Sequence, residues 1–202
     1  MSFKVGVGKS DFEALRKSDD YYVDKTDILY ELVEEKDNQV TLFTRPRRFG
    51  KTLMMSMMSN FFSITKDGRA IFEGLKITEY KKFCGKWMNQ YPVLFLSFKD
   101  VEAENFEGAY DMLEARLSEV CIEQAALKSD SKVNRNDVAT FERLEAQKGT
   151  RADVKNSLKT IMRMMHAVYG KKVILLLDEY DVPLAAASEK DPAANKSYPC
   201  WM

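Results

Sequence analysis

The sequence has little of what metal sites and disulfide scaffolds are built from. Its 202 residues contain one histidine, His166, and three cysteines, Cys84, Cys121 and Cys200. The cysteines are odd in number and far apart, with neither a C-x-x-C pair nor zinc-ligand spacing around His166. This pattern argues against a disulfide framework and favours a reducing cytosol as the compartment.

Long apolar runs and net charge are absent as well. No segment approaches the roughly 18 apolar residues of a membrane span, and the N-terminus MSFKVGVGKSDF lacks the apolar stretch of a secretion signal. Lys plus Arg and Asp plus Glu both number 31, so no overall field draws the chain to nucleic acid or anionic lipid. We therefore expect a cytoplasmic protein without a membrane partner, and a nucleic-acid partner gains no support from the net charge.

The sequence does have strand and helix signals that alternate along the chain. Strands are predicted at 40–44, 92–98 and 173–178, where β-branched and apolar residues cluster. Helices are predicted as two short ones within 11–36 and as longer ones at 51–62, 108–127 and 151–169, with a polar loop at 128–136. Thr150 and Asp153 form a capping-box-like start for the last helix. This order predicts an α/β fold with a mostly parallel sheet, which binds ligands beyond the carboxyl ends of its strands.

A candidate phosphate-binding loop follows the first predicted strand. The usual P-loop reads glycine, four residues, then Gly-Lys-Ser/Thr, because backbone N–H groups must surround a phosphate without obstruction by Cβ atoms. Gly50-Lys51-Thr52 supplies the second half, whereas Arg45 stands where the first glycine belongs. Lys51 would contact the β- and γ-phosphates of ATP, and the Thr52 hydroxyl would bind Mg²⁺. The predicted nucleotide-binding residues are Arg45, Pro46, Arg47, Arg48, Phe49, Gly50, Lys51, Thr52 and Leu53.

Two acids close the third predicted strand. The apolar run from Val173 to Leu177 ends in Asp178-Glu179, which is the pattern of a Walker B motif. In that motif the first acid holds Mg²⁺, usually through water, and the second orients or deprotonates the attacking water. The metal ligands are therefore predicted to be Thr52 and Asp178, and the catalytic residues Lys51 and Glu179.

Each motif also has a plainer interpretation. Residues 45–52 could form a basic surface turn, and acids at strand ends often serve as solubilising caps. Gly8-Lys9-Ser10 also ends like a P-loop, but Phe3 replaces its first glycine and no strand is predicted before it. The combination of a phosphate loop and an acidic strand end favours the nucleotide site over these alternatives.

The chain resembles the bacterial AAA-ATPase-like family in four segments. They are Asp11-Phe12, YYVDKT at 21–26, RPRRFGKTL at 45–53 and LDEYDVPL at 177–184. The resemblance covers about residues 6–184 and accounts for Arg45, because that family is similar in using RPRRFGK(S/T) as its phosphate loop. It implies a P-loop NTPase-type, three-layer αβα fold, ATP and Mg²⁺ as cofactors, and the roles given above for Lys51, Thr52, Asp178 and Glu179.

Members of the resembled family are longer. We therefore expect a P-loop domain at 1–184, an irregular tail at 185–202, and a truncated chain whose sheet is incomplete at its C-terminal side. The missing strand would normally lie between the two motif strands, so either these strands pair directly or a protein partner or second copy supplies one. On this hypothesis the isolated chain binds nucleotide weakly or not at all, and hydrolysis belongs to the intact architecture. An inactive fragment is the alternative.

A few further residues allow a functional or a structural interpretation. A non-catalytic module whose loop arginines contact DNA or RNA phosphates is the competing function. Tyr21 or Tyr22 could stack on adenine, although packing of this segment is the simpler interpretation. His166 is interpreted as a partly buried structural histidine. Core packing is predicted for Met54, Met55, Met57 and Met58.

Overall fold

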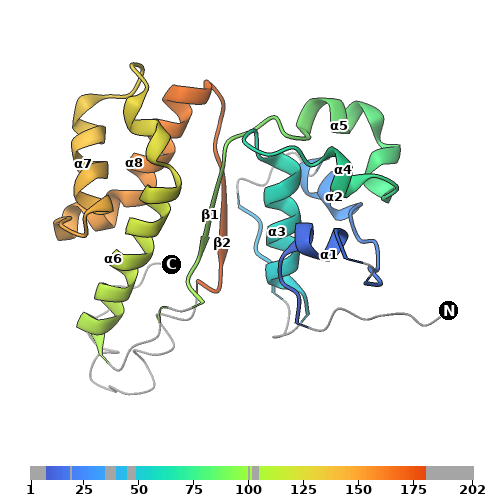
Figure 1. Cartoon of the computed structure of the whole chain (residues 1–202), viewed down its shortest axis with the longest axis horizontal. Helices are drawn as coiled ribbons and strands as arrows, with labels where there is room; N and C mark the ends of the chain where they lie inside the picture. Colours follow the sequence, from blue (N-terminus) through green and yellow to red (C-terminus); the bar gives the residue numbers. More distant parts are fainter. Residues whose placement is uncertain are drawn as a thin grey trace. The chain divides into compact units, whose positions relative to one another are not determined.

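The computed structural model describes residues 8–18, 20–34, 40–44, 49–99, 101 and 105–180. The chain forms two compact units, unit 1 with residues 1–93 and unit 2 with residues 94–202 (Figure 1). Within the described residues, no helix is both long and apolar enough to cross a membrane. Arg45, Pro46, Arg47 and Arg48 of the predicted phosphate loop lie outside the described residues, as does the predicted tail at 185–202.

Unit 1 consists of short helices around a core of aromatic rings. The helices are α1 (Phe12–Arg16), α2 (Ile28–Glu34), α3 (Lys51–Phe62), α4 (Arg69–Phe72) and α5 (Lys81–Trp87), and η1 (Lys76–Glu79) is a 3-10 turn. The side chains of Phe12, Phe61 and Phe72 are fully buried. The ring of Phe72 lies 5.0 Å from that of Phe12 and 5.3 Å from that of Phe61. These aromatic contacts join α1, α3 and α4.

The predicted strand at 40–44 is wrong. This segment has no strand structure, and the side chains of Val40 and Leu42 are 84% and 59% exposed. A strand is stabilised when a neighbouring strand satisfies its backbone N–H and C=O groups. Among the described residues the sheet contains only the two strands of the 92–98 and 173–178 regions, so the β-branched residues of VTLFT have no strand to pair with.

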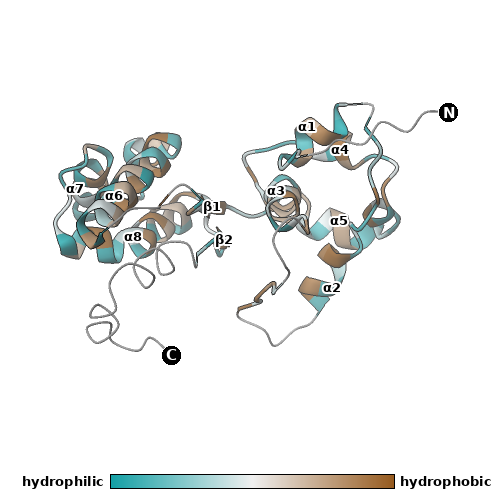
Figure 2. Ribbon diagram, turned by 90° about the horizontal axis from the view of Figure 1, so that it is seen from below, coloured by the Kyte–Doolittle hydropathy of each residue, from teal (hydrophilic) through white to brown (hydrophobic). Residues whose placement is uncertain are grey.

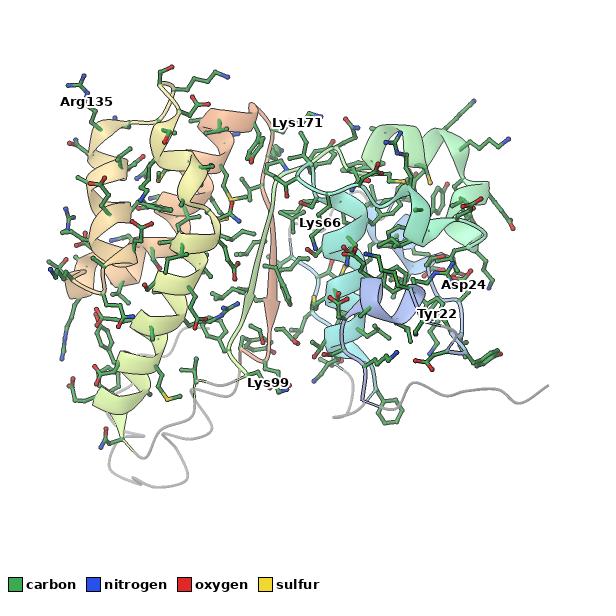
Figure 3. All side chains as sticks on the ribbon, in the orientation of Figure 1. Tyr22, Asp24, Lys66, Lys99, Arg135 and Lys171 are labelled. Atoms are coloured by element: carbon green, nitrogen blue, oxygen red, sulfur yellow. The ribbon has the colours of Figure 1, made fainter. Side chains whose placement is uncertain are left out.

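The sheet is formed by β1 (Val93–Ser97) and β2 (Ile174–Asp178), which run parallel. Lys99, just after β1, and Lys171, just before β2, lie at opposite ends of the sheet, as parallel strands require (Figure 3). Between the strands the chain forms α6 (Phe106–Glu123), η2 (Ala125–Ser129), α7 (Arg135–Glu145) and α8 (Arg151–Tyr169). The α/β class and the parallel sheet are therefore confirmed, whereas α7 was not predicted.

The core of unit 2 lies between the sheet and the three long helices. Each of α6, α7 and α8 has hydrophobic and hydrophilic residues on different sides (Figure 2). The buried cluster draws on both strand and helices: Leu94, Leu96, Leu117, Val120, Cys121, Leu127, Val133, Phe141, Leu144, Val154, Ile161, Met164 and Met165. This cluster fixes the sheet against the helices, so the ends of β1 and β2 are held on a packed support.

Local sequence signals set the limits of α8. The Thr150 side chain accepts from Asp153 N at 3.1 Å and the Asp153 carboxylate accepts from Thr150 N at 3.0 Å, which completes the predicted capping box. Gly170 ends the helix in the left-handed conformation with φ 66°. The predicted span of this helix is confirmed.

Candidate functional site

Helix α3 begins directly at the predicted phosphate loop. Gly50 is its N-cap residue, in the left-handed conformation with φ 76° and ψ 24°, and no side chain caps the helix. Only glycine adopts this conformation readily. The first backbone bond runs from Met54 N to Gly50 O at 2.9 Å, so the N–H groups of Lys51, Thr52 and Leu53 make no bond within the helix. A helix start of this kind favours an anionic ligand.

The residues around this helix start differ in exposure. Lys51, Thr52 and Leu53 are half-buried, and the Phe49 side chain is 64% exposed. Further along α3, Met57 and Met58 are buried whereas Met54 and Met55 are half-buried, which confirms core packing for the first pair. The helix therefore has a packed C-terminal part and a more accessible first turn.

Part of the Asp11-Phe12 motif anchors α3. Phe12 N donates to Ser56 Oγ at 2.9 Å, and the Asp11 carboxylate caps α1 by accepting from Ala14 N at 2.6 Å. The side-chain amide of Asn60 donates to the backbone carbonyl of the same serine, Ser56 O, at 2.9 Å. This motif therefore positions the helix that carries Lys51 and Thr52, a structural role that the sequence pattern alone did not indicate.

The YYVDKT segment is a second structural anchor of unit 1. The Asp24 carboxylate accepts from Lys76 N at 2.7 Å and Thr26 N at 2.9 Å, and Thr26 Oγ1 accepts from Ile77 N at 3.1 Å. Burial raises the pKa of Asp24, but these hydrogen bonds outweigh it and hold the pKa below its usual value. The segment thus ties the chain before α2 to η1, with Asp24 at that junction (Figure 3).

Tyr22 is half-buried and packs against the core of unit 1. Its ring meets the ring of Phe12 edge-on at 5.5 Å, and its hydroxyl donates to the sulfur of Met57 at 3.6 Å. Burial also raises the pKa of Tyr22. These contacts favour the packing interpretation of Tyr22 over adenine stacking, whereas the Tyr21 side chain is 54% exposed.

Asp178 is the last residue of β2 and has an unsatisfied carboxylate oxygen. Its side chain is 3% exposed, and Oδ2 has no hydrogen-bond partner among the described residues. A buried carboxylate oxygen without a partner is costly, and hard cations such as Mg²⁺ take such oxygens as ligands. Within the described chain no three His, Cys, Asp or Glu side chains gather as a metal site. Asp178 therefore offers a single carboxylate oxygen to a cation, whose other ligands would have to come from elsewhere.

The backbone around Asp178 is fixed at both sides. Phe98 N donates to Asp178 O at 3.0 Å, which extends the β1–β2 pairing to the strand end. Glu179 follows in the left-handed conformation with φ 51°, which is uncommon for residues other than glycine, and its side chain is half-buried. The chain therefore turns sharply at the residue that the sequence assigned to catalysis, and such conformations cluster at functional sites.

Arg116 is a candidate residue that sequence analysis missed. From α6 its Nε donates to Ser97 O at 3.3 Å, at the carboxyl end of β1, and it pairs with Glu119 at 2.7 Å. Its side chain is 25% exposed. The sequence places Arg116 far from β1, so its position at the end of this strand becomes visible only in the folded structure.

Two other residues of the sequence analysis have structural contacts. Lys9 of the rejected Gly8-Lys9-Ser10 segment forms an ion pair with Asp20 at 2.5 Å, and the helix after it, α1, is short. His166 is exposed, which corrects the prediction of partial burial, and its Nδ1 lies 2.8 Å from Lys171 O. His166 lies in the last turns of α8, on the exposed side of the helix and not on its buried apolar side.

The predicted residues thus fall into two groups. Phe49 to Leu53 belong to unit 1, and Asp178 and Glu179 belong to unit 2. The parallel β1–β2 sheet and the helices packed on it place the chain in the α/β class. The chain belongs to the Predicted AAA-ATPase family, whose sequence model matches residues 6–199.

A curated relative is known from Azotobacter chroococcum mcd 1. It is an uncharacterized protein in the vnfD 5′ region, 28% identical over 182 residues, which are 90% of this chain and 30% of the relative. The chain therefore spans less than a third of that protein. No solved structure matches the chain.

Proposed function

We propose that this chain binds Mg-ATP through residues 45–53 and Asp178. The observation that carries the proposal is the buried Oδ2 of Asp178, which has no partner among the described residues and sits at the end of β2. Membership in the Predicted AAA-ATPase family supports ATP as the ligand. The uncapped start of α3 after Gly50 supports a phosphate as the group that is bound there.

The proposed roles follow from the chemistry of each side chain. Mg²⁺, once bound, would supply positive charge that neutralises the phosphates of ATP. Lys51 adds a positive charge to the same phosphates, Thr52 offers its hydroxyl to the metal, and Asp178 holds the metal directly or through water. Glu179 accepts the proton of the attacking water, or orients that water, in the hydrolysis that we propose for the intact architecture.

An additional strand is part of this proposal. Residues 40–44 precede the phosphate loop in the sequence and form no strand among the described residues. A strand from a longer polypeptide or a partner chain would pair with the backbone N–H and C=O groups of 40–44 and so stabilise the segment that precedes the phosphate loop. The isolated chain is therefore expected to bind nucleotide weakly and to turn it over slowly.

Calorimetric titration with ATP tests the binding proposal. Binding is expected to require Mg²⁺ and to be lost in Lys51→Ala and in Asp178→Asn, because each removes a proposed charge at the nucleotide. Lys9→Ala is the matched control, since Lys9 belongs to the similar Gly-Lys-Ser segment and pairs with Asp20. Equal affinity in Lys51→Ala and in the unaltered chain would refute the proposal.

Hydrolysis is tested separately by phosphate release. Glu179→Gln should retain nucleotide binding and lose turnover when a longer polypeptide or a partner chain supplies an added strand. Steady turnover by the 202-residue chain, abolished by Lys51→Ala and by Glu179→Gln, would overturn the requirement for an added strand.

A further inference from the structure

Two polar side chains stand next to each other in a sheet that is otherwise apolar. β1 reads VLFLS and β2 reads ILLLD, so Ser97 and Asp178 are the only polar residues of these two strands. Each is the last residue of its strand, and Phe98 N donates to Asp178 O at 3.0 Å. In a parallel pair this bond places Ser97 directly beside Asp178. The sheet therefore brings its two polar side chains together at its carboxyl end (Figure 1).

Ser97 and Asp178 also lie on the same face of the sheet. Successive side chains of a strand point to opposite faces. Leu96 and Leu177, which precede the two polar residues, belong to the hydrophobic core that the sheet shares with α6, α7 and α8. Ser97 and Asp178 are therefore on the face that points away from this core. Because neighbouring strands lie about 4.8 Å apart, the two side chains are within reach of one shared ligand.

Neither side chain uses its full hydrogen-bonding capacity within the described part of the chain. Asp178 is 3% exposed, and its Oδ2 has no described partner. The half-buried hydroxyl of Ser97 accepts from Lys99 N at 3.3 Å, but it donates to no described residue. Although the two side chains are neighbours, Oδ2 does not accept a hydrogen bond from this hydroxyl. A group that contacts both oxygens would satisfy them together.

The backbone of Ser97 is held from the outer edge of β1. Because Phe98 N bonds to β2, the carbonyl of Ser97 points to the other side of the strand. Arg116 Nε donates to this carbonyl at 3.3 Å, and the guanidinium is paired with Glu119 at 2.7 Å. Arg116 therefore fixes the strand end to α6, with its charge balanced by Glu119. A carboxylate and a hydroxyl held in this way are oxygen donors, which suit a hard cation and its water ligands.

We propose that Ser97 is a further residue of the magnesium site, where its hydroxyl binds a water molecule of the hydrated cation that Asp178 holds. This inference rests on the proposed Mg-ATP function and adds to it a residue from β1. Mg²⁺ gives up its waters reluctantly and usually keeps several of them in proteins, so a neutral hydroxyl beside the carboxylate suits one of these waters. Ser97 is thus a positioning residue, which acts through the cation and its water and does not touch the nucleotide.

Calorimetric titration of the 202-residue chain with Mg-ATP tests this role. Ser97→Ala is expected to weaken binding about tenfold, as the loss of an outer-shell partner of a metal does. Ser97→Thr keeps a hydroxyl at the same position and should bind as the unaltered chain does. Ser131→Ala, at an exposed position before α7, is the matched control and should leave the affinity unchanged. Without ligand, the urea midpoint of Ser97→Ala should equal that of the unaltered chain.

The outcomes separate the role of Ser97 from the proposed function. Mg-ATP binding that is lost in Asp178→Asn but unchanged in Ser97→Ala would overturn the role of Ser97 and leave the function in place. A lower urea midpoint of Ser97→Ala without ligand would make the serine structural and would also overturn it. So would Ser97→Thr that binds as weakly as Ser97→Ala. Absence of Mg-ATP binding in the unaltered chain would refute the proposed function, and this inference with it.

Discussion

The backbone N–H of Phe12 donates a 2.9 Å hydrogen bond to the hydroxyl of Ser56, which joins the start of α1 to the middle of α3. Both partners are buried, with Phe12 at 0% and Ser56 at 8% exposure. Because α3 begins at Lys51, the N-terminal segment holds the helix whose first turn carries the proposed phosphate contacts. This hydrogen bond therefore contributes both to the stability of unit 1 and to the position of the first turn of α3.

Ser56→Ala is expected to destabilise the chain by about 1–3 kcal/mol, because the buried Phe12 N–H loses its acceptor. Urea denaturation monitored by circular dichroism measures the change. Ser10→Ala, at an exposed position before α1, should change the free energy of unfolding by less than about 0.5 kcal/mol. Equal effects of the two substitutions would contradict the role of the Phe12 to Ser56 bond.

Asp178→Asn is expected to raise the melting temperature of the chain in the absence of Mg²⁺. The substitution replaces a buried carboxylate, whose Oδ2 has no described partner, by a neutral amide. The expected gain is up to about 1 kcal/mol, because the amide removes the buried negative charge but still leaves a buried polar atom unpaired. Thermal scans with and without Mg-ATP then measure how much the ligand stabilises each protein. The ligand should raise the melting temperature of the unaltered chain, through preferential binding to the folded state, and leave that of the variant unchanged.

Gly85→Ala and Gly68→Ala are expected to change stability in opposite directions. At Gly85 a Cβ meets no atom within 4 Å, so alanine should stabilise α5 by about 0.5–1 kcal/mol. At Gly68 the same atom would lie 2.8 Å from Asn60 O, so alanine should destabilise by about 1–3 kcal/mol through overpacking. Chemical denaturation of the two variants side by side measures both signs. A loss of stability in Gly85→Ala would show that this glycine is needed for the fold itself.

The stability of unit 2 should fall in acid through Asp153. Hydrogen bonds from Arg143, at 3.0 and 2.9 Å, and from Thr150 N hold the pKa of Asp153 below its usual value of 3.8. A carboxylate with a lowered pKa stabilises the folded state at neutral pH. That contribution is lost as the pH falls from about 4 towards the lower pKa of the folded state.

The pH dependence is measured by urea denaturation of the chain and of Asp153→Asn across the acid range. The variant should be less stable at neutral pH and should show a flatter decline below about pH 4. Asp67→Asn is the control. The pKa of Asp67 is lowered to about 2 by Arg69, but both residues are exposed and only two positions apart, so this pair contributes little to folding.

The sequence predicted those parts of the fold that depend on local signals. The limits of α8 were visible in Thr150, Asp153 and the periodic apolar stripe, and the parallel strands were visible in their apolar runs. Helix α7 was missed because it is mostly polar and buries only Asp137, Phe141 and Leu144. Its place is fixed instead by contacts such as the ion pair of Asp137 with Arg163 on α8.

Two kinds of site residue could not be assigned from local patterns. Asp24 and Thr26 were part of a family motif, but their partners Lys76 and Ile77 lie about 50 positions away. For residues 40–44 the local pattern predicted a strand that the structure does not have. A segment with high strand propensity forms a strand only where a second strand is available to pair with it. Sequence patterns identified the motif residues, whereas tertiary contacts determined which of them are structural.

The parallel pairing of β1 with β2 also has a consequence for folding kinetics. Phe98 and Asp178, whose backbones bond at the strand ends, are about 80 residues apart, whereas α6, α7 and α8 contact neighbours in sequence. Closing a long loop costs entropy before the pairing rewards it, so the helical hairpins are expected to form first and the sheet afterwards. The carboxylate of Asp178 would then reach its buried position only in the last step of folding, and its backbone amide neighbours would be the slowest to gain protection from hydrogen exchange.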